Sequence, residues 1–156
     1  MTKIIQLTQG KVTLVSDEDY AWLAEYSWTY QHDNYATHYY RVGAKVKAIC
    51  LQNLIMNPPL GYVADHIDGN GLNNQRNNLR VCTPLQNRWN RRPNKGQRYK
   101  GAYLKSHGRW YARIQVCGEA MHLGTYDTEE EAAHAYDKAA QKHFGEYAYL
   151  NFPGNI

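Results

Sequence analysis

The residues best suited to chemistry are Asp65 and His66, which are adjacent in the chain, and Asn87, which lies 21 positions after His66. An imidazole can take a proton from water near neutral pH. A carboxylate and an amide oxygen are hard ligands, which suit magnesium or manganese better than zinc. Hydrolysis of a phosphodiester needs an activated water, a divalent cation on the phosphate and assistance to the leaving oxygen. These three residues can supply the protein's share of that chemistry.

The surrounding segment predicts the elements that must position them. Residues 65–78 are rich in asparagine and glycine, which favours a long loop held by side-chain hydrogen bonds. Residues 62–64 and 79–82 are the expected strands on either side of it. Thr83 followed by Pro84 predicts the start of a helix that runs towards Asn90.

The first 57 residues predict an α+β scaffold without a catalytic motif of its own. Two short strands are expected around the turn pair Gln9-Gly10. Ser16 and the three acids after it predict a helix, and its apolar face contains Tyr20, Trp22, Leu23 and Tyr26. Three strands with turns at residues 32–34 and 43–44 should follow, and then a short helix over 51–56 that Pro58-Pro59 stops.

A run of basic residues follows the candidate chemistry. Between Arg88 and Arg98 the chain has no acid, and Pro93 and Gly96 break any helix. The bases are Arg88, Arg91, Arg92, Lys95 and Arg98. Such a local concentration of charge is typical of a segment that contacts phosphates, although a solvated loop would look the same.

The remaining segment predicts three strands and one helix. Strand patterns occur in KGAYLK, RWYARIQV and AMHLGTYD. Thr128 with Glu131 predicts a capping box, and Gly145 the end of the helix. One stripe at helical spacing should face the sheet, and it contains Ala132, Ala133, Tyr136, Ala139, Ala140 and Phe144.

The segment DHIDGNGLNNQRNNLR, followed by VCTPLQN, resembles the HNH endonucleases, particularly those of phages and homing elements. The resemblance spans about residues 63–90 and implies two antiparallel strands and a helix around one metal ion. It implies catalytic roles for His66, as general base, and for Asn78, which supports the loop. It also implies that Asp65 and Asn87 bind the metal, with magnesium expected and manganese as the alternative.

Two further positions bear on that resemblance. Asp68 and Asn70 fall in a turn of the loop, where a structural role is expected. Gln52 stands where related sequences often have a histidine.

Residues 99–153 resemble the APETALA-type (ethylene-response-factor) DNA-binding domain, on the strength of LGTYDTEEEAAHAYD and LNFP. Plant members of that family read DNA with the strands of a three-stranded sheet. Arg suits guanine edges and Gln suits adenine, whereas Lys mostly contacts phosphate. Trp110 could stack on a base or sugar, or lie in the core. The resemblance implies DNA contacts from Lys100, Tyr103, Lys105, Arg109, Arg113, Gln115 and His122.

Together these patterns predict an α+β protein: an HNH ββα-metal module, then a small three-stranded antiparallel sheet packed on one helix. The expected division is a scaffold at 1–57, the nuclease core at 58–90, a basic linker at 91–98 and the DNA-binding domain at 99–156. The predicted function is a site-specific, metal-dependent homing endonuclease that cuts double-stranded DNA as a monomer.

Two alternatives from other classes stay open. One is a non-catalytic DNA-binding regulator that keeps the nuclease part as a scaffold. The other is an RNA-binding protein, because basic and aromatic surfaces also suit single strands.

Other features exclude whole classes of protein. No apolar run approaches the roughly 18 residues of a membrane span, and the N-terminus does not read as a signal peptide. The cysteines Cys50, Cys82 and Cys117 lie far apart and indicate neither a zinc site nor a disulfide framework. We therefore expect a cytoplasmic protein, in the host cell of a phage or mobile element.

Overall fold

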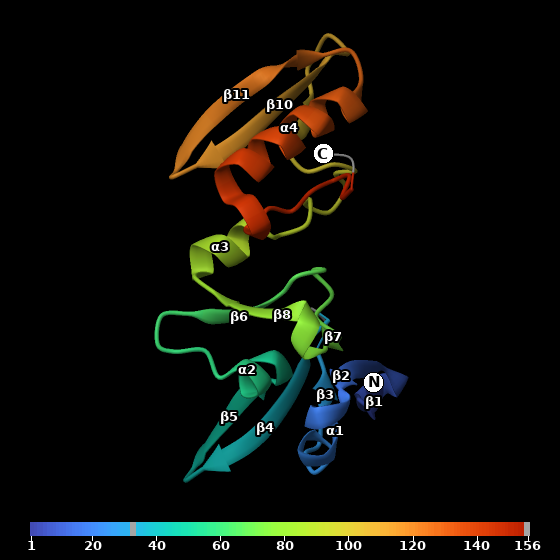
Figure 1. The fold of residues 1–156 in the computed structure, drawn as a ribbon, viewed down its shortest axis with the longest axis vertical. Coiled ribbons are helices and arrows are strands. Elements are labelled where there is room, and N and C mark those ends of the chain that lie inside the picture. The colour runs from blue at the N-terminus through green and yellow to red at the C-terminus, as the bar shows by residue number, and fades with distance from the viewer. Residues whose placement is uncertain (32–33, 155–156) are drawn as a thin grey trace. The chain divides into compact units, whose positions relative to one another are not determined.

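The computed structural model describes residues 1–31 and 34–154, which divide into two compact units, Met1–Asn87 and Arg88–Ile156 (Figure 1). The turn expected at residues 32–34 lies partly outside the described residues, as do residues 155 and 156 of the predicted C-terminal domain. Both units mix helices with small sheets, so the predicted α+β class is confirmed.

The first unit is built from short elements. Its strands are β1 (Thr2–Gln6), β2 (Val12–Ser16), β3 (Thr29–Tyr30), β4 (Ala36–Val42), β5 (Lys45–Cys50), β6 (Val63–His66), β7 (Asn73–Asn74) and β8 (Leu79–Cys82). Its helices are α1 (Asp17–Leu23) and α2 (Leu51–Met56), with 3-10 turns η1 (Thr8–Gly10) and η2 (Arg76–Asn78). Helix α3 (Pro84–Trp89) begins in this unit, where Thr83 and Gln86 cap it reciprocally.

Three small sheets make up this unit, in the orders β1-β2-β7, β3-β4-β5 and β6-β8. Strands β6 and β8 are antiparallel and place Asp65 opposite Arg80. The two-residue strand β7 pairs in parallel with β2, with Val15 opposite Asn74. That pairing fastens the asparagine-rich loop to the N-terminal hairpin, although the two segments are far apart in sequence.

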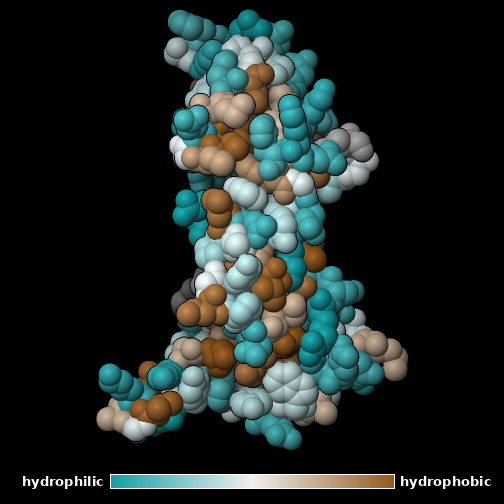
Figure 2. Space-filling model, turned by 60° about the vertical axis from the view of Figure 1, so that its left-hand side comes forward, coloured by the Kyte–Doolittle hydropathy of each residue, from teal (hydrophilic) through white to brown (hydrophobic). Residues whose placement is uncertain are grey.

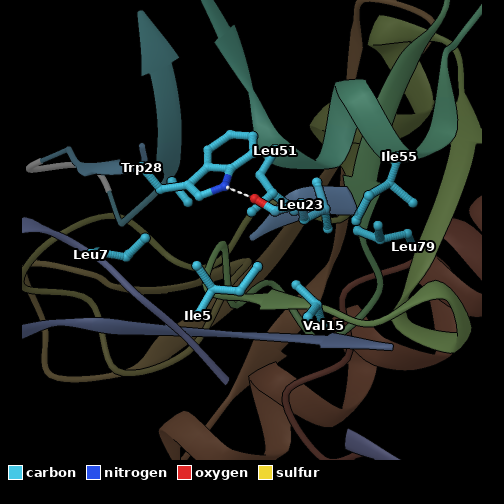
Figure 3. Close-up of a cluster of buried hydrophobic side chains, with 9 residues drawn as sticks. Ile5, Leu7, Val15, Leu23, Trp28, Leu51, Ile55 and Leu79 are labelled. Atoms are coloured by element: carbon cyan, nitrogen blue, oxygen red, sulfur yellow. Dashed lines mark hydrogen bonds between the residues drawn. The ribbon is translucent and has the colours of Figure 1, made fainter. Parts of the chain in front are cut away.

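A buried cluster of apolar side chains holds the first unit together (Figure 3). Trp28 lies within it and donates its indole N–H to the carbonyl of Leu23 at 2.9 Å. Leu23 is fully buried and Trp22 packs against the cluster, as expected. Tyr20 and Tyr26 are exposed, so the predicted apolar face is only half correct. Asp19 is buried instead, because its carboxylate pairs with Arg76 at 2.7 Å.

The second unit contains the antiparallel sheet β11-β10-β9 and one long helix. Its elements are β9 (Ala102–Leu104), β10 (Trp110–Val116), β11 (Glu119–Tyr126), α4 (Glu129–Phe144) and the 3-10 turn η3 (Gly145–Tyr147). Ala112 and Ile114 of β10 are buried beneath α4, opposite Ala132, Ala133 and Ala140. Alanines let the helix approach the sheet closely, and the predicted capping box at Thr128 and Glu131 is present.

The chain after α4 returns to the start of β9 through a buried carboxylate. Asp137 of α4 accepts hydrogen bonds from the backbone N–H groups of Asn151 and Phe152, both at 2.9 Å. The Asn151 side chain in turn bonds the backbone N–H and C=O of Lys100. This network closes the second unit, and the sequence pattern gave no sign of it.

On the face drawn in Figure 2, hydrophobic side chains form small groups that hydrophilic side chains separate. No helix in the described ranges combines the length and the hydrophobicity needed to cross a membrane. The three cysteines are free thiols.

Candidate functional site

Asp65 and His66 lie side by side at the end of β6 and are almost completely buried, at 6% and 4% exposure. The Asp65 carboxylate accepts from Arg80, whose Nη2 and Nε lie 2.8 and 3.0 Å from Oδ2. Arg80 comes from the facing position of β8, so strand pairing sets this ion pair. A carboxylate with such a partner is held in one orientation.

The His66 ring is fixed by a chain of hydrogen bonds that runs through Asn74. Nε2 of His66 lies 3.0 Å from Oδ1 of Asn74. The Asn74 amide nitrogen donates to Thr13 Oγ1 and to the carbonyl of Gly71, so its oxygen must be the acceptor for His66. The ring proton of a neutral His66 therefore sits on Nε2, and Nδ1 is the basic atom.

The surroundings of His66 favour its neutral form. Burial, the largest influence, lowers the pKa of His66 below its ordinary value. The bond to Asn74 and the charges of Asp68 and Asp65 act in the opposite direction without cancelling it. A neutral imidazole at physiological pH is the form that can accept a proton.

Asn78 closes the loop between β6 and β8. Its side chain accepts from the backbone N–H of Asp68 at 3.1 Å and donates to Asp68 Oδ1 at 2.9 Å and to the carbonyl of Asn73 at 2.8 Å. Burial disfavours the Asp68 carboxylate, but hydrogen bonds from Asn70, Asn73 and Asn78 outweigh it and lower the pKa of Asp68. The hydrogen bonds between Asp68 and Asn78 therefore fix the loop two residues after His66.

Asn87 lies on α3 near the Cys82 thiol. Burial, and then the charge of Asp65, raise the pKa of Cys82, whereas Arg80 and a hydrogen bond from the backbone N–H of Asn87 act in the opposite direction. Asp65 and the backbone of Asn87 therefore both influence one sulfur atom. Along the β6-β8 pair Asp65 lies opposite Arg80, whereas Cys82, which precedes α3 and Asn87, lies opposite Val63.

A second group of predicted residues meets on the face of the β9–β11 sheet that points away from α4. Tyr103 stacks on Tyr111 with ring centroids 5.3 Å apart, and Tyr111 lies 5.9 Å from the His122 ring. Arg113 faces His122 across the strand pair, and both are exposed. We call this surface the open face, and its members are Tyr103, Lys105, Tyr111, Arg113, Gln115 and His122.

Lys105 and Gln115 lie at the two ends of the open face. The Lys105 ammonium donates to Thr125 at 2.9 Å and lies 5.7 Å from the centroid of the Tyr111 ring. Gln115 donates to the carbonyl of Gly118 at 3.1 Å. Tyr111 was not among the predicted DNA contacts, although strand alternation with Arg113 and Gln115 could have identified it.

Other predicted DNA contacts lie elsewhere. The Lys100 ammonium donates to the carbonyls of Trp89 and Arg91 at 2.6 and 2.7 Å and lies over the Tyr136 ring of α4, so it is not on the open face. Burial, followed by the charge of Arg91, lowers the pKa of Lys100 to about 8. Trp110 packs partly buried against the core.

The remaining basic residues lie at the surface. Arg109 pairs with Asp127 and Arg98 with Glu130, each at 3.0 Å. Exposed pairs of this kind are weak and can exchange for phosphate contacts. Arg88, Arg91, Arg92 and Lys95 are exposed.

The nuclease site matches a known family. Residues 57–89 match the family model described as HNH endonuclease. An uncharacterized HNH endonuclease of Acanthamoeba polyphaga mimivirus is 30% identical over 145 residues, which cover 92% of this chain and 76% of the viral protein. The chain belongs to the HNH endonuclease family.

Plant proteins match a shorter part of this HNH protein. The dehydration-responsive element-binding protein 2D of Arabidopsis thaliana is 45% identical over 60 residues, 37% of this chain and 29% of the plant protein. The AP2/ERF and B3 domain-containing protein Os01g0141000 of Oryza sativa subsp. japonica is 47% identical over 57 residues, 36% and 16% of the two chains. These matches confirm the APETALA-type DNA-binding domain, and both resemblances imply that the protein binds DNA.

HNH nucleases generally use a divalent metal, and the donor set here fits a hard cation. Asp65 offers a carboxylate and Asn87 an amide oxygen. Among the described residues no group of three or more His, Cys, Asp or Glu side chains could hold a metal.

Proposed function

We propose that this protein is a site-specific, metal-dependent DNA endonuclease of the homing kind, which acts in the cytoplasm of a host cell. The observation that carries the proposal is the geometry of His66. Its ring is neutral, held in one tautomer by Asn74 and adjacent to the Asp65–Arg80 pair. A ring fixed with Nδ1 as its basic atom suits the role of a general base.

In the proposed reaction, Nδ1 of His66 takes a proton from the attacking water. The imidazolium that forms is stabilised by the charges of Asp65 and Asp68, which both favour the protonated ring. Asn74 prevents the ring from rotating, and Arg80 keeps the Asp65 carboxylate in place. A divalent ion, magnesium or manganese, would be held by Asp65 and Asn87 and would stabilise the charge on the phosphate.

The open face is the proposed reader of the DNA sequence. Arg113 and Gln115 have the donors and acceptors that distinguish guanine and adenine edges. Tyr103, Tyr111 and His122 provide rings between them, and Lys105 suits a phosphate. The basic side chains at positions 88, 91, 92, 95, 98 and 109 would contact the phosphate backbone.

The test is cleavage of supercoiled plasmid DNA with magnesium, with and without a chelator. His66→Ala should lower the cleavage rate by roughly 10²–10⁴-fold, because a general base acts in the transition state. Affinity for DNA should stay unchanged. His143→Ala, which removes an exposed imidazole from α4, is the matched control. If the two variants cut equally fast, His66 is not the base.

The alternative is a DNA-binding regulator without nuclease activity. The close pairing of Asp65 with Arg80 favours it, because the pair resembles a structural ion pair. This alternative predicts that wild-type protein binds plasmid DNA but leaves it supercoiled at every magnesium or manganese concentration.

A further inference from the structure

Strands β4 and β5 extend well beyond the short strand β3, which pairs with β4 in the same sheet (Figure 1). Strand β3 pairs only with Thr37 and Ala36 at the start of β4. The β4–β5 pairing continues to Val42 opposite Lys45, where Gly43, at φ +60°, and Ala44 make the turn. Residues 39–48 therefore form a two-stranded ribbon with both faces and both edges exposed, which we call the ribbon tip.

The ribbon tip is basic and has no acid to balance it. It contains Arg41, Lys45 and Lys47, all exposed, and the chain has no Asp or Glu from residue 34 to residue 64. None of the ion pairs within the described residues involves these three side chains. These three exposed charges are therefore accessible to an anionic partner.

Apolar side chains are exposed among these charges. Val46, Val42 and Tyr39 are 61%, 50% and 48% exposed. On one face Tyr40 lies opposite Lys47, and its ring stacks on His38, next to an open apolar pocket. An isolated two-stranded ribbon is marginal in water. Exposed valines and tyrosines on it favour a partner that covers them.

We propose that the ribbon tip is a DNA-binding surface that enters the major groove. A two-stranded ribbon fits that groove, which is about 12 Å wide. The three basic side chains would contact phosphates, and the valines and tyrosines would contact thymine methyl groups and sugars. A second copy of this chain fits less well, because it would bring six like charges together without an acid between them. The inference rests on the proposed function only in taking DNA as the substrate.

The test measures binding of the full chain to mixed-sequence duplex DNA by fluorescence anisotropy over a range of salt concentrations. Lys45→Gln/Lys47→Gln removes two charges from the ribbon tip. Lys138→Gln/Lys142→Gln removes two exposed charges from α4 and is the matched control. Two lost phosphate contacts should make the slope of log K against log salt shallower by about 1.8 and weaken binding at least about tenfold near 0.1 M salt. The control should match wild type.

Each outcome supports or overturns the proposal. Equal slopes for the two double variants, with unchanged melting temperatures, would overturn it even if the protein cuts DNA. In a second outcome, the wild-type protein cuts no DNA while its salt-dependence slope still depends on Lys45 and Lys47. That result would overturn the proposed endonuclease activity and support the ribbon tip as a DNA-binding surface. Sedimentation that shows a dimer dissociated by Val46→Ser, with DNA affinity intact, would assign the ribbon tip to a second copy instead.

Discussion

At the scale of single residues, the neighbours of His66 decide what its ring can do. The motif identifies the histidine, but its tautomer depends on Asn74, and the position of Asn74 depends on Thr13. Thr13 lies on β2 and carries no sequence signal that links it to the site. The parallel pairing of β2 with the two-residue strand β7 brings it there. Such a contact cannot be read from spacing.

Asn74→Asp should move the pH profile of cleavage. Burial lowers the pKa of His66, so the acid limb of the rate should lie below about pH 6.5, the ordinary value. A carboxylate at position 74 would stabilise the imidazolium, raise the pKa and shift that limb to higher pH. Single-turnover rates at saturating metal measure the shift. Asn74→Ala is the control, since it removes the hydrogen bond without adding charge. If the cleavage rate of Asn74→Asp falls at the same acidic pH as that of wild type, the His66 ring does not titrate in the reaction.

Lys100 gives a second prediction at this scale. Its pKa falls to about 8 in the folded protein, from 10.5, so between these values the unfolded chain holds more protons. The free energy of unfolding should therefore rise as pH increases through this window, relative to a variant without the amine. Urea titrations of wild type and Lys100→Met at about pH 7.5 and about pH 9.5 measure the difference. Lys138→Met should follow wild type. If the free energy of unfolding changes equally with pH in wild type and Lys100→Met, Lys100 is not desolvated.

At the scale of elements, the sequence predicts most of what the structure contains. Helix α2 occupies residues 51–56 as expected, and α3 begins at Pro84 behind the Thr83 cap. These boundaries depend on local chemistry, namely caps, prolines and alternation. The resemblance to the plant domain implied a DNA contact from Lys100, and in the structure its ammonium binds the carbonyls of Trp89 and Arg91. Its neighbours come from distant parts of the chain, which local patterns do not bring together.

Gly101 tests how closely α4 lies on the start of β9. A Cβ at this position would overlap the Tyr136 ring, and the backbone has φ +79°. Gly101→Ala should destabilise the second unit, by roughly 1–3 kcal/mol for overpacking and about 1–2 kcal/mol for the left-handed backbone. Thermal unfolding of the full chain should show an earlier transition for the second unit, above which the DNA contacts of the open face are lost. Gly108→Ala is the control, because its φ is +78° but no atom lies within 4 Å of the added Cβ. Equal losses in the two variants would exclude the overlap as the cause.

At the scale of the whole molecule, the basic segment is not a free spacer at its start. The Trp89 ring, at the end of α3, stacks on Phe144 with centroids 4.5 Å apart. Its carbonyl accepts from Lys100 and from the backbone N–H of Tyr149. Residues before the predicted linker at 91–98 therefore belong to the core of the second unit. The sequence could not show this, because Trp89 also fits the predicted helix of the nuclease.

This arrangement predicts different behaviour for two C-terminal fragments. A fragment of residues 88–156 keeps Trp89 against Phe144, whereas residues 99–156 lack it and leave the Lys100 ammonium without its two carbonyls. Loss of a fully buried Trp typically costs about 3–5 kcal/mol, and Trp89 is partly buried, so the shorter fragment should lose less than this but still melt at a lower temperature. Both should bind duplex DNA while folded, because the open face is complete in each, and neither should cut it. Trp89→Ala in the longer fragment is the control, and it should reproduce most of the loss. If the two fragments melt together, the second unit begins after residue 98, and Trp89 belongs to the nuclease alone.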